Sequence, residues 1–131
     1  MNKAEENEIK VFYCKSNEED PYDEWDVKVS YKDTFPTLSD IENDYVELPI
    51  PNKFWWGWGS RGWETNERTL DEIFGLMNNY SRNPIADGRG GEMQNWIKEH
   101  GVRHTSMSVG DAVSIGDKTF VCARFGWNKV A

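Results

Sequence analysis

The sequence has little cysteine and histidine and no long apolar segment. Its 131 residues include two cysteines and two histidines. No run approaches the roughly 18 consecutive apolar residues that a transmembrane helix needs. The segment MNKAEENEIK at residues 1–10 is polar and acidic, and it lacks the basic and apolar regions of a signal peptide. We therefore expect a cytoplasmic protein with no membrane-spanning segment.

The two cysteines, Cys14 and Cys122, lie far apart in the sequence and show no CxxC spacing. A reducing compartment keeps such thiols free, so no disulfide is predicted. Cys122 lies within TFVCARF, which has the pattern of a buried strand. This pattern favours a core cysteine over a thiol–imidazole pair with His104, although the residue types would allow such a pair.

The two histidines, His100 and His104, are four residues apart, a spacing that places two metal ligands on one face of a helix. Gly101 is expected to end the helix between them, which separates the two rings. The glycine-rich stretch 86–92 lacks the Lys and Ser/Thr of a phosphate-binding loop. The acidic stretch 18–26 lacks the spacing of a calcium-binding loop. We therefore predict neither a metal nor a cofactor.

The acidic charge of the chain belongs to its first half. The formal net charge is −8, with fourteen acidic and five basic residues in 1–50 and nine acidic and ten basic residues in 51–131. A uniformly negative molecule would repel nucleic acid, whereas a bipolar one can present a basic face to phosphates. The acidic half could also imitate the phosphate spacing of DNA. Both alternatives stay open.

Three segments of the first half have the patterns of strands. The run IKVFYC at 9–14 is β-branched and aromatic, which favours a buried strand. In WDVKVSYKD at 25–33, apolar and polar residues alternate with a period of two, as in a strand with one solvated face. These two segments could pair as a hairpin. The run YVELPI at 45–50 could form a third strand, whose end Pro49 confines to a sheet edge.

Helix signals lie between and after these segments. Residues 38–41 predict one helical turn capped by Thr37, and Thr69 with Glu72 forms a capping box that marks the beginning of a longer helix. A second helix is predicted over 92–100. Both of these helices repeat residues at offsets 0, 3, 4 and 7 and so place them on one face. They are Leu70, Ile73, Phe74 and Met77 in the first, and Met93, Trp96, Ile97 and His100 in the second.

A hairpin closes the chain. Gly116 and Asp117 form a two-residue turn suited to type II′ between two apolar runs. The predicted fold is therefore α+β, a small single domain with an antiparallel sheet, two short helices and a C-terminal β-hairpin. It covers residues 1–131, with an acidic strand-rich part at 1–50 and a helix–helix–hairpin part at 69–131.

The segment richest in aromatic residues is PNKFWWGWGSRGWETNERTL at 51–70, with four tryptophans and three glycines. In a small domain, Phe54 and at least two of these tryptophans are expected to be buried. The rest could stack on bases or sugars, or anchor a protein interface, where Trp and Arg are favoured. The candidate binding surface consists of Trp58, Arg61, Trp63, Lys53 and Arg68.

Two stretches of the second half match a known pattern. TLDEIFGLMN at 69–78 and HTSMSVGDAVSIGDKTFVCARFGW at 104–127 resemble the YodL-like domain family of plasmid, conjugative-element and phage proteins. The resemblance implies an accessory protein of a mobile element in a bacterial cell, with no known catalytic residue. The matching residues are Ser106, Ser108, Val109, Gly110 and Asp111 in one motif and Phe125, Gly126 and Trp127 in the other.

The first motif also has a physical reading. Ser106 and Ser108 can bond neighbouring backbone groups, and Gly110 with Asp111 can turn the chain into the hairpin. We therefore interpret the motif as a signature of the fold.

Three classes of function follow from these observations. The first is a non-enzymatic interaction protein of a phage or mobile element that acts on a host or viral protein. The second is a nucleic-acid binder, which needs its basic residues on one face: Lys53, Arg61, Arg68, Arg82, Arg89, Arg103 and Arg124. The third is an enzyme, which needs His104 or His100 within hydrogen-bond reach of a carboxylate or thiol in a pocket. We expect the first.

Overall fold

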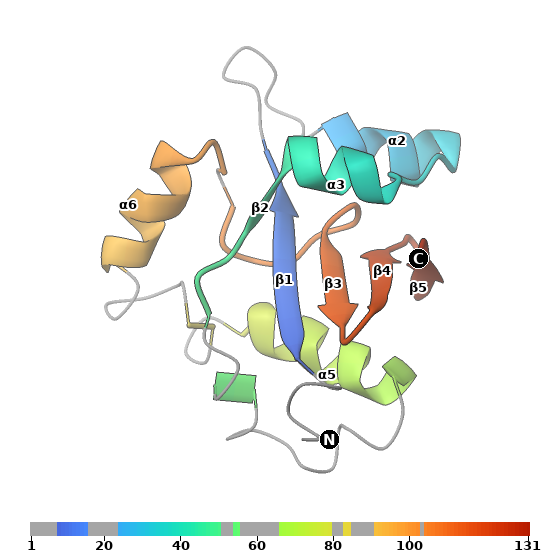
Figure 1. Cartoon of the computed structure of the whole chain (residues 1–131). Helices are drawn as coiled ribbons and strands as arrows, with labels where there is room; N and C mark the ends of the chain where they lie inside the picture. Colours follow the sequence, from blue (N-terminus) through green and yellow to red (C-terminus); the bar gives the residue numbers. More distant parts are fainter. Residues whose placement is uncertain are drawn as a thin grey trace.

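The computed structural model describes residues 8–15, 24–50, 54–55, 66–79, 83–84, 91–102 and 104–131. Their centre is a five-stranded antiparallel sheet with the strand order β2-β1-β3-β4-β5 (Figure 1). The strands are β1 (Ile9–Cys14), β2 (Tyr45–Glu47), β3 (Ala112–Ile115), β4 (Lys118–Cys122) and β5 (Trp127–Lys129). Together with the helices that pack on this sheet, they confirm the predicted α+β class.

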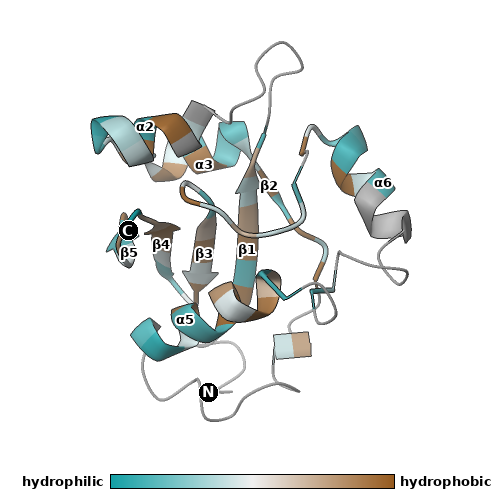
Figure 2. Ribbon diagram, turned by 180° about the vertical axis from the view of Figure 1, so that it is seen from behind, coloured by the Kyte–Doolittle hydropathy of each residue, from teal (hydrophilic) through white to brown (hydrophobic). Residues whose placement is uncertain are grey.

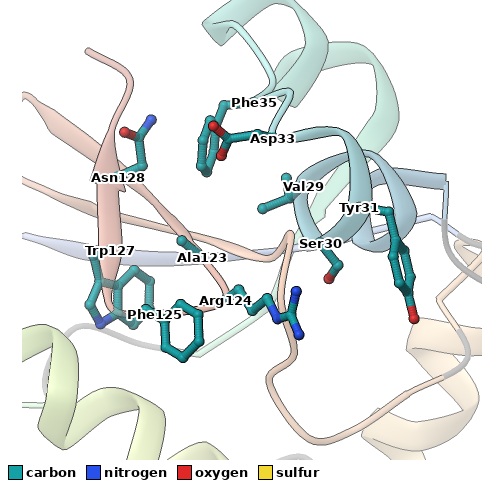
Figure 3. Close-up of a pocket in the computed structure, with 10 residues that line it drawn as sticks. All are labelled: Val29, Ser30, Tyr31, Asp33, Phe35, Ala123, Arg124, Phe125, Trp127 and Asn128. Atoms are coloured by element: carbon teal, nitrogen blue, oxygen red, sulfur yellow. The ribbon is translucent and has the colours of Figure 1, made fainter.

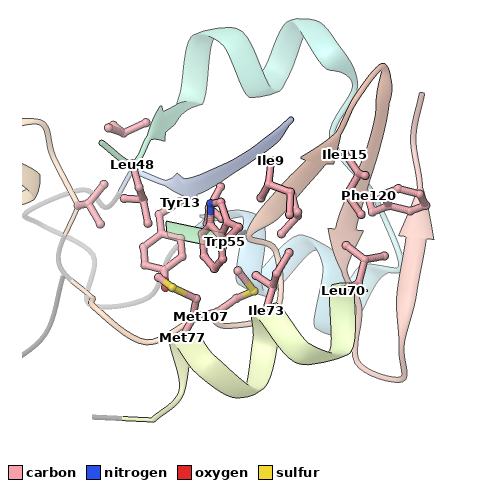
Figure 4. Close-up of a cluster of buried hydrophobic side chains, with 14 of the residues drawn as sticks. Ile9, Tyr13, Leu48, Trp55, Leu70, Ile73, Met77, Met107, Ile115 and Phe120 are labelled. Carbon is pink, nitrogen blue, oxygen red and sulfur yellow. The ribbon is translucent and has the colours of Figure 1, made fainter. Parts of the chain in front are cut away.

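The interior strand β1 confirms the strand predicted at 9–14, and it contributes to two buried clusters. Successive side chains of a strand point to opposite faces. Ile9, Val11 and Tyr13 therefore join a large cluster on one face (Figure 4). Cys14 joins a smaller cluster on the other face. The sheet is thus buried on both sides.

Helix α5 (Asn66–Met77) packs against the large cluster. Leu70, Ile73 and Met77 are buried, as their helical spacing predicts, whereas Phe74 is 38% exposed. Figure 2 shows hydrophobic residues in the parts of α2 and α5 nearest the central strands and hydrophilic residues towards the outer ends of both helices.

The predicted capping box at Thr69 is wrong. The helix begins three residues earlier, at Asn66, so Thr69 lies inside it and is buried. Glu67 occupies the first turn, where an acidic side chain complements the helix dipole. Glu72 instead lies 3.9 Å from Arg68 Nε, as an i,i+4 ion pair on the helix surface. Glu72 therefore forms a surface ion pair rather than a cap.

The strand predicted at 25–33 is also wrong, because this segment forms helix α2 (Glu24–Lys32). Trp25 and Val29, four residues apart, lie on one helical face and are buried, whereas Tyr31 is 82% exposed. Lys28 Nζ lies 4.3 Å from the centre of the Trp25 ring, one turn away. The predicted hairpin with 9–14 is wrong as well, since β1 pairs with β2 and β3.

Helix α3 (Leu38–Asp44) follows, and its predicted cap is confirmed. The Asp40 N–H donates to Thr37 Oγ1 at 3.2 Å, and the Thr37 N–H donates to Asp40 Oδ2 at 2.9 Å. The indole Nε1 of Trp25 donates to Asp44 Oδ2 at 3.2 Å and so joins α2 to α3. The strand β2 comes next and lies at a sheet edge, as the position of Pro49 predicts.

Helix α6 (Gly91–Glu99) matches the helix predicted at 92–100 to within one residue. Gly101 has φ +90°, a value that favours glycine, and it ends the helix as predicted. The Val102 N–H donates to Ile97 O at 2.8 Å, and the Gly101 N–H donates to Lys98 O at 3.1 Å. These two bonds form a Schellman motif.

The C-terminal hairpin is confirmed. Ile115 pairs with Lys118, so Gly116 and Asp117 form a two-residue loop between β3 and β4. Gly116 has φ +61° while Asp117 has no positive φ, as a type II′ turn requires. Within the described ranges, no helix has both the length and the apolar character that crossing a membrane requires.

Candidate functional site

The strand β5 forms an open edge of the sheet. The Ala123 N–H donates to Gly126 O, and the Val130 N–H donates to Thr119 O, both at 2.9 Å, so these groups of β5 and its flanks face β4. Backbone groups alternate in direction along a strand. The N–H and C=O groups of Trp127 and Lys129 therefore point outward. Among the described residues, no strand pairs with this side of β5.

A groove lies between β5 and α2, and we call it the α2-side groove. Its volume is about 490 Å³. Figure 3 shows Val29, Ser30 and Tyr31 on its helix side and Arg124 and Phe125 on its strand side. Phe125 is 89% exposed, and the Arg124 guanidinium lies 5.8 Å from the centre of its ring. The lining is completed by Asp33, Phe35, Ala123, Trp127 and Asn128.

A second groove, the α5-side groove, lies on the opposite face of β5. Its volume is about 450 Å³. Trp127 lines both grooves and makes an edge-on contact with Phe74, with 6.5 Å between the ring centres. The lining residues are Glu67, Leu70, Asp71, Phe120, Gly126, Trp127 and Lys129. The open edge is therefore bordered by a groove on each face of the sheet.

The binding surface predicted from the sequence falls mostly outside the described residues. This applies to Lys53, Trp58, Arg61 and Trp63. Arg68 lies on the exposed face of α5. Within the same tryptophan-rich segment, Trp55 is buried and Phe54 is partly buried against the large cluster. The expected burial is thus found for Trp55 and in part for Phe54, and the other tryptophans of the segment lie outside the described residues.

The nucleic-acid alternative needs seven basic residues on one face, and the described ranges contain only Arg68 and Arg124 among them. Arg68 lies in the first part of α5, and Arg124 lies in the turn between β4 and β5. Lys53, Arg61, Arg82, Arg89 and Arg103 lie outside those ranges. The clustering that this alternative requires stays a prediction.

A polar cluster lies where the loop after α6 meets the end of β1, beside the beginning of β3. Its centre is the carboxylate of Asp111, which is completely buried. His104 Nε2 lies 3.0 Å from Asp111 Oδ2, and Cys14 Sγ lies 3.5 Å from Asp111 Oδ1. Neither β5 groove is lined by these residues.

Backbone groups fix this carboxylate in place. The Cys14 N–H donates to Oδ1 of Asp111 at 3.1 Å, and the Ser108 N–H donates to Oδ2 at 2.9 Å. The Ser108 hydroxyl lies 3.2 Å from Oδ2 and bonds the carboxylate rather than a neighbouring backbone group. Gly110, with φ +98°, turns the chain between them. The turn predicted for the Ser–x–Ser–Val–Gly–Asp stretch is therefore confirmed.

Tyr13 covers the cluster on its other side. Its ring stacks on the His104 ring with 4.6 Å between centres, and its hydroxyl donates to Thr105 O at 2.8 Å. Asn83 Nδ2 donates to the same carbonyl at 2.7 Å. Burial, followed by the negative charge of Asp111, raises the pKa of the Tyr13 phenol well above its usual value. The phenol therefore stays a hydrogen-bond donor at neutral pH.

The residues of this cluster differ from the two pairs considered from the sequence, which were His100 with His104 and Cys122 with His104. His100 is exposed and stacks on Trp96 with 3.8 Å between ring centres, while His104 faces Asp111. Cys122 is buried and forms no disulfide, as predicted, and Cys14 is the thiol that lies near His104. No local sequence pattern predicts this cluster, because residues 14, 104 and 111 come together only through the β1–β3 pairing.

Taken together, the described residues define a small α+β protein in which the β5 edge of the sheet has a groove on each face and a buried polar cluster surrounds Asp111. Comparison of the chain with protein-family models, with curated proteins and with solved structures finds no match. The resemblance to the YodL-like family therefore stays a prediction that rests on the two sequence motifs.

Proposed function

We propose that this protein is a non-enzymatic interaction protein that binds an extended, basic segment of a partner protein along β5. The observation that carries this proposal is the presence of a groove on each face of the open edge. A strand added to a sheet edge directs successive side chains to opposite faces. The bound segment would therefore fill the α2-side and α5-side grooves with alternate side chains.

Main-chain hydrogen bonds would hold such a segment. The outward N–H and C=O groups of Trp127 and Lys129 offer the ladder positions that strand addition uses. The side chains would then select the sequence. Leu70, Phe120 and Trp127 offer an apolar floor on the α5 side, and Phe125 offers an exposed ring on the other.

Charge supports a basic partner. The protein carries a formal net charge of −8, and among the described residues that line the α5-side groove, Glu67 and Asp71 are acidic and Lys129 alone is basic. The exposed rings of Tyr31 and Phe125 can also receive Lys or Arg side chains over their faces. The negative electrostatic potential of these groups speeds association with a positively charged segment and disfavours binding of acidic segments.

A non-enzymatic role is supported by the burial of the polar cluster. Cys14 and Asp111 are both 0% exposed, and the Asp111 oxygens already accept bonds from backbone groups. A substrate therefore has no access to this carboxylate or this thiol. The resemblance to the YodL-like family supports the setting, a bacterial cell that carries a phage or mobile element, with a host or viral protein as the partner.

The proposal can be tested with displayed peptides of about eight residues, slightly longer than a typical strand. A selected peptide is synthesised and its affinity is measured for the full-length protein and two variants. Lys129→Pro removes the outward N–H while the bonds to β4 stay, and Lys129→Gln removes the charge but keeps the N–H. Loss of ladder bonds should weaken binding by at least about tenfold in K129P. K129Q should bind within a few-fold of the wild type.

Three outcomes would contradict the proposal. In the first, the peptide binds K129P as tightly as the wild type, so the edge is not used. In the second, no peptide is selected although the protein is folded. In the third, single-stranded DNA or RNA binds at low salt and peptides do not, which would favour the nucleic-acid alternative.

A further inference from the structure

Three side chains with metal-binding chemistry converge from separate segments in the polar cluster. Cys14 ends β1, His104 lies in the loop after α6, and Asp111 precedes β3. One ligand atom from each of them lies within 4.8 Å of the other two. Cys14 and Asp111 are completely buried, and the His104 side chain is 21% exposed. This buried group of a thiol, an imidazole and a carboxylate differs from a cluster of acidic groups on the surface, which is common without a bound metal.

The spacing suits a small ion. A zinc ion binds sulfur at about 2.3 Å and nitrogen or oxygen at about 2.0–2.2 Å, so its ligand atoms lie roughly 3–4 Å apart. In the cluster, His104 Nε2 lies 3.0 Å from Asp111 Oδ2 and Cys14 Sγ lies 3.5 Å from Asp111 Oδ1. Small movements of the thiol and the imidazole ring would close the set around one ion.

The surroundings already orient the ligands. The N–H groups of Cys14 and Ser108 and the Ser108 hydroxyl hold the Asp111 carboxylate in place. The Tyr13 ring stacks on the imidazole and sets its plane. Outer contacts of this kind orient the ligands of metal sites. An ion would replace the contacts that His104 Nε2 and Cys14 Sγ make with the Asp111 carboxylate.

We propose that Cys14, His104 and Asp111 form a binding site for one divalent transition-metal ion of the zinc class. The donor set combines a thiolate, an imidazole and a carboxylate, which suits zinc or cobalt rather than magnesium or calcium. The thiol loses its proton on binding, and the histidine binds through the lone pair of Nε2. A thiolate and a carboxylate then neutralise the two positive charges, which lowers the cost of burying the ion.

The test uses the full-length protein, stripped of metal with a chelator and kept reduced. It is titrated with Co²⁺, whose bond to a thiolate gives an intense near-ultraviolet band, and with Zn²⁺ in competition. We expect one equivalent of Co²⁺ to bind the wild type with the thiolate band. Cys14→Ser should abolish the band, and both C14S and His104→Gln should weaken binding by about 100-fold. Cys122→Ser, which removes the other buried thiol, should bind as the wild type does.

Some results would overturn the proposal. These are the absence of a thiolate band in the folded wild type, its loss in C122S, or its survival in C14S. Because C14S alters the interior, its fold is checked by circular dichroism before titration. X-ray absorption of the zinc-loaded wild type gives a second test that needs no variant. One sulfur at about 2.3 Å supports the site, and a shell of oxygen alone contradicts it.

Discussion

Asp111 is a charged residue in a place where charge is unfavourable, and the neighbouring residues explain how it is tolerated. A buried carboxylate needs hydrogen-bond donors for its lone pairs. Cys14 and Ser108 supply backbone N–H groups, and His104 supplies a ring nitrogen. The carboxylate thereby joins the end of β1 to the loop that precedes β3. The Asp111 side chain thus bonds the Cys14 N–H just beyond Phe12 and Ala112, where the paired residues of β1 and β3 end.

Asp111→Asn should therefore destabilise the protein strongly. The amide has nearly the same shape, but its NH2 group would face a donor from Cys14 or Ser108, and the charge-assisted bonds would be lost. We expect the free energy of unfolding to fall by about 3 kcal/mol, measured by urea denaturation with a chelator present. Asp117→Asn, in the exposed hairpin turn, is the matched control and should change it by less than about 0.5 kcal/mol. Equal effects in the two variants would show that the network is dispensable.

At the scale of elements, some helix ends and turns are easier to predict than the choice between helix and strand, although the capping box predicted at Thr69 is wrong. Thr37, Gly101 and Gly116 each impose a local geometry, and each is found where the sequence predicts it. Residues 25–33 show why the rest is harder. Their alternation fits a strand, but Trp25 and Val29 fit a helical face equally well. Packing against the sheet decides between the two, because strand preference depends on context.

Two glycines in helical segments should respond in opposite directions to alanine. Gly75 lies within α5, and a Cβ added there would meet no other atom within 4 Å, so Gly75→Ala should stabilise the protein by about 0.5–1 kcal/mol. Gly101 has φ +90°, and its nearest neighbour to a Cβ is Lys15 Cγ at an ordinary 3.7 Å. Gly101→Ala should therefore cost about 1 kcal/mol through backbone strain alone. Thermal unfolding of the two variants checks both signs, and a stabilising G101A would refute the helix-end assignment.

At the scale of the whole molecule, the two halves of the sequence meet side by side in one sheet, at the β1–β3 pairing. Strands β1 and β2 come from the acidic half, and β3, β4 and β5 come from the half that resembles the YodL-like family. The strand β3 has β1 on one side and β4 on the other. The hairpin of β3 and β4 is therefore flanked by β5 on one side and by β1 on the other. Because β1 comes from the acidic half, the family-like half alone lacks one of these two flanking strands.

A fragment of residues 66–131 should consequently fail to fold alone. Without β1, the buried Val113 and Ile115 of β3 would lie at an exposed edge. We expect a poorly dispersed NMR spectrum and no cooperative unfolding. Addition of a separate fragment of residues 1–65 should restore the spectrum of the intact chain. A cooperative transition in the isolated fragment would show that the second half is an independent unit.

The candidate sites could not be predicted in the same way as the elements. The α5-side groove needs Leu70 and Trp127 on one face, and the polar cluster needs Cys14 and Asp111, which are 97 residues apart. No local period encodes such distances. What the sequence does supply is the residues themselves, since Phe125 and Trp127 belong to the second of the two family-like motifs. Their exposure depends on Gly126, whose φ of +82° turns the chain beside the open edge.

The position of β1 has a consequence for how the chain is made. Its two neighbours in the sheet are β2, which follows soon after, and β3, which lies about a hundred residues later. At roughly 5–20 residues per second, a ribosome needs on the order of 5–20 s to supply β3 after β1. During that interval an apolar strand that will become an interior strand of the sheet has one unpaired side. Pairings so distant in sequence also form slowly. Nascent chains of this protein should thus be clients of a ribosome-associated chaperone until synthesis is nearly complete.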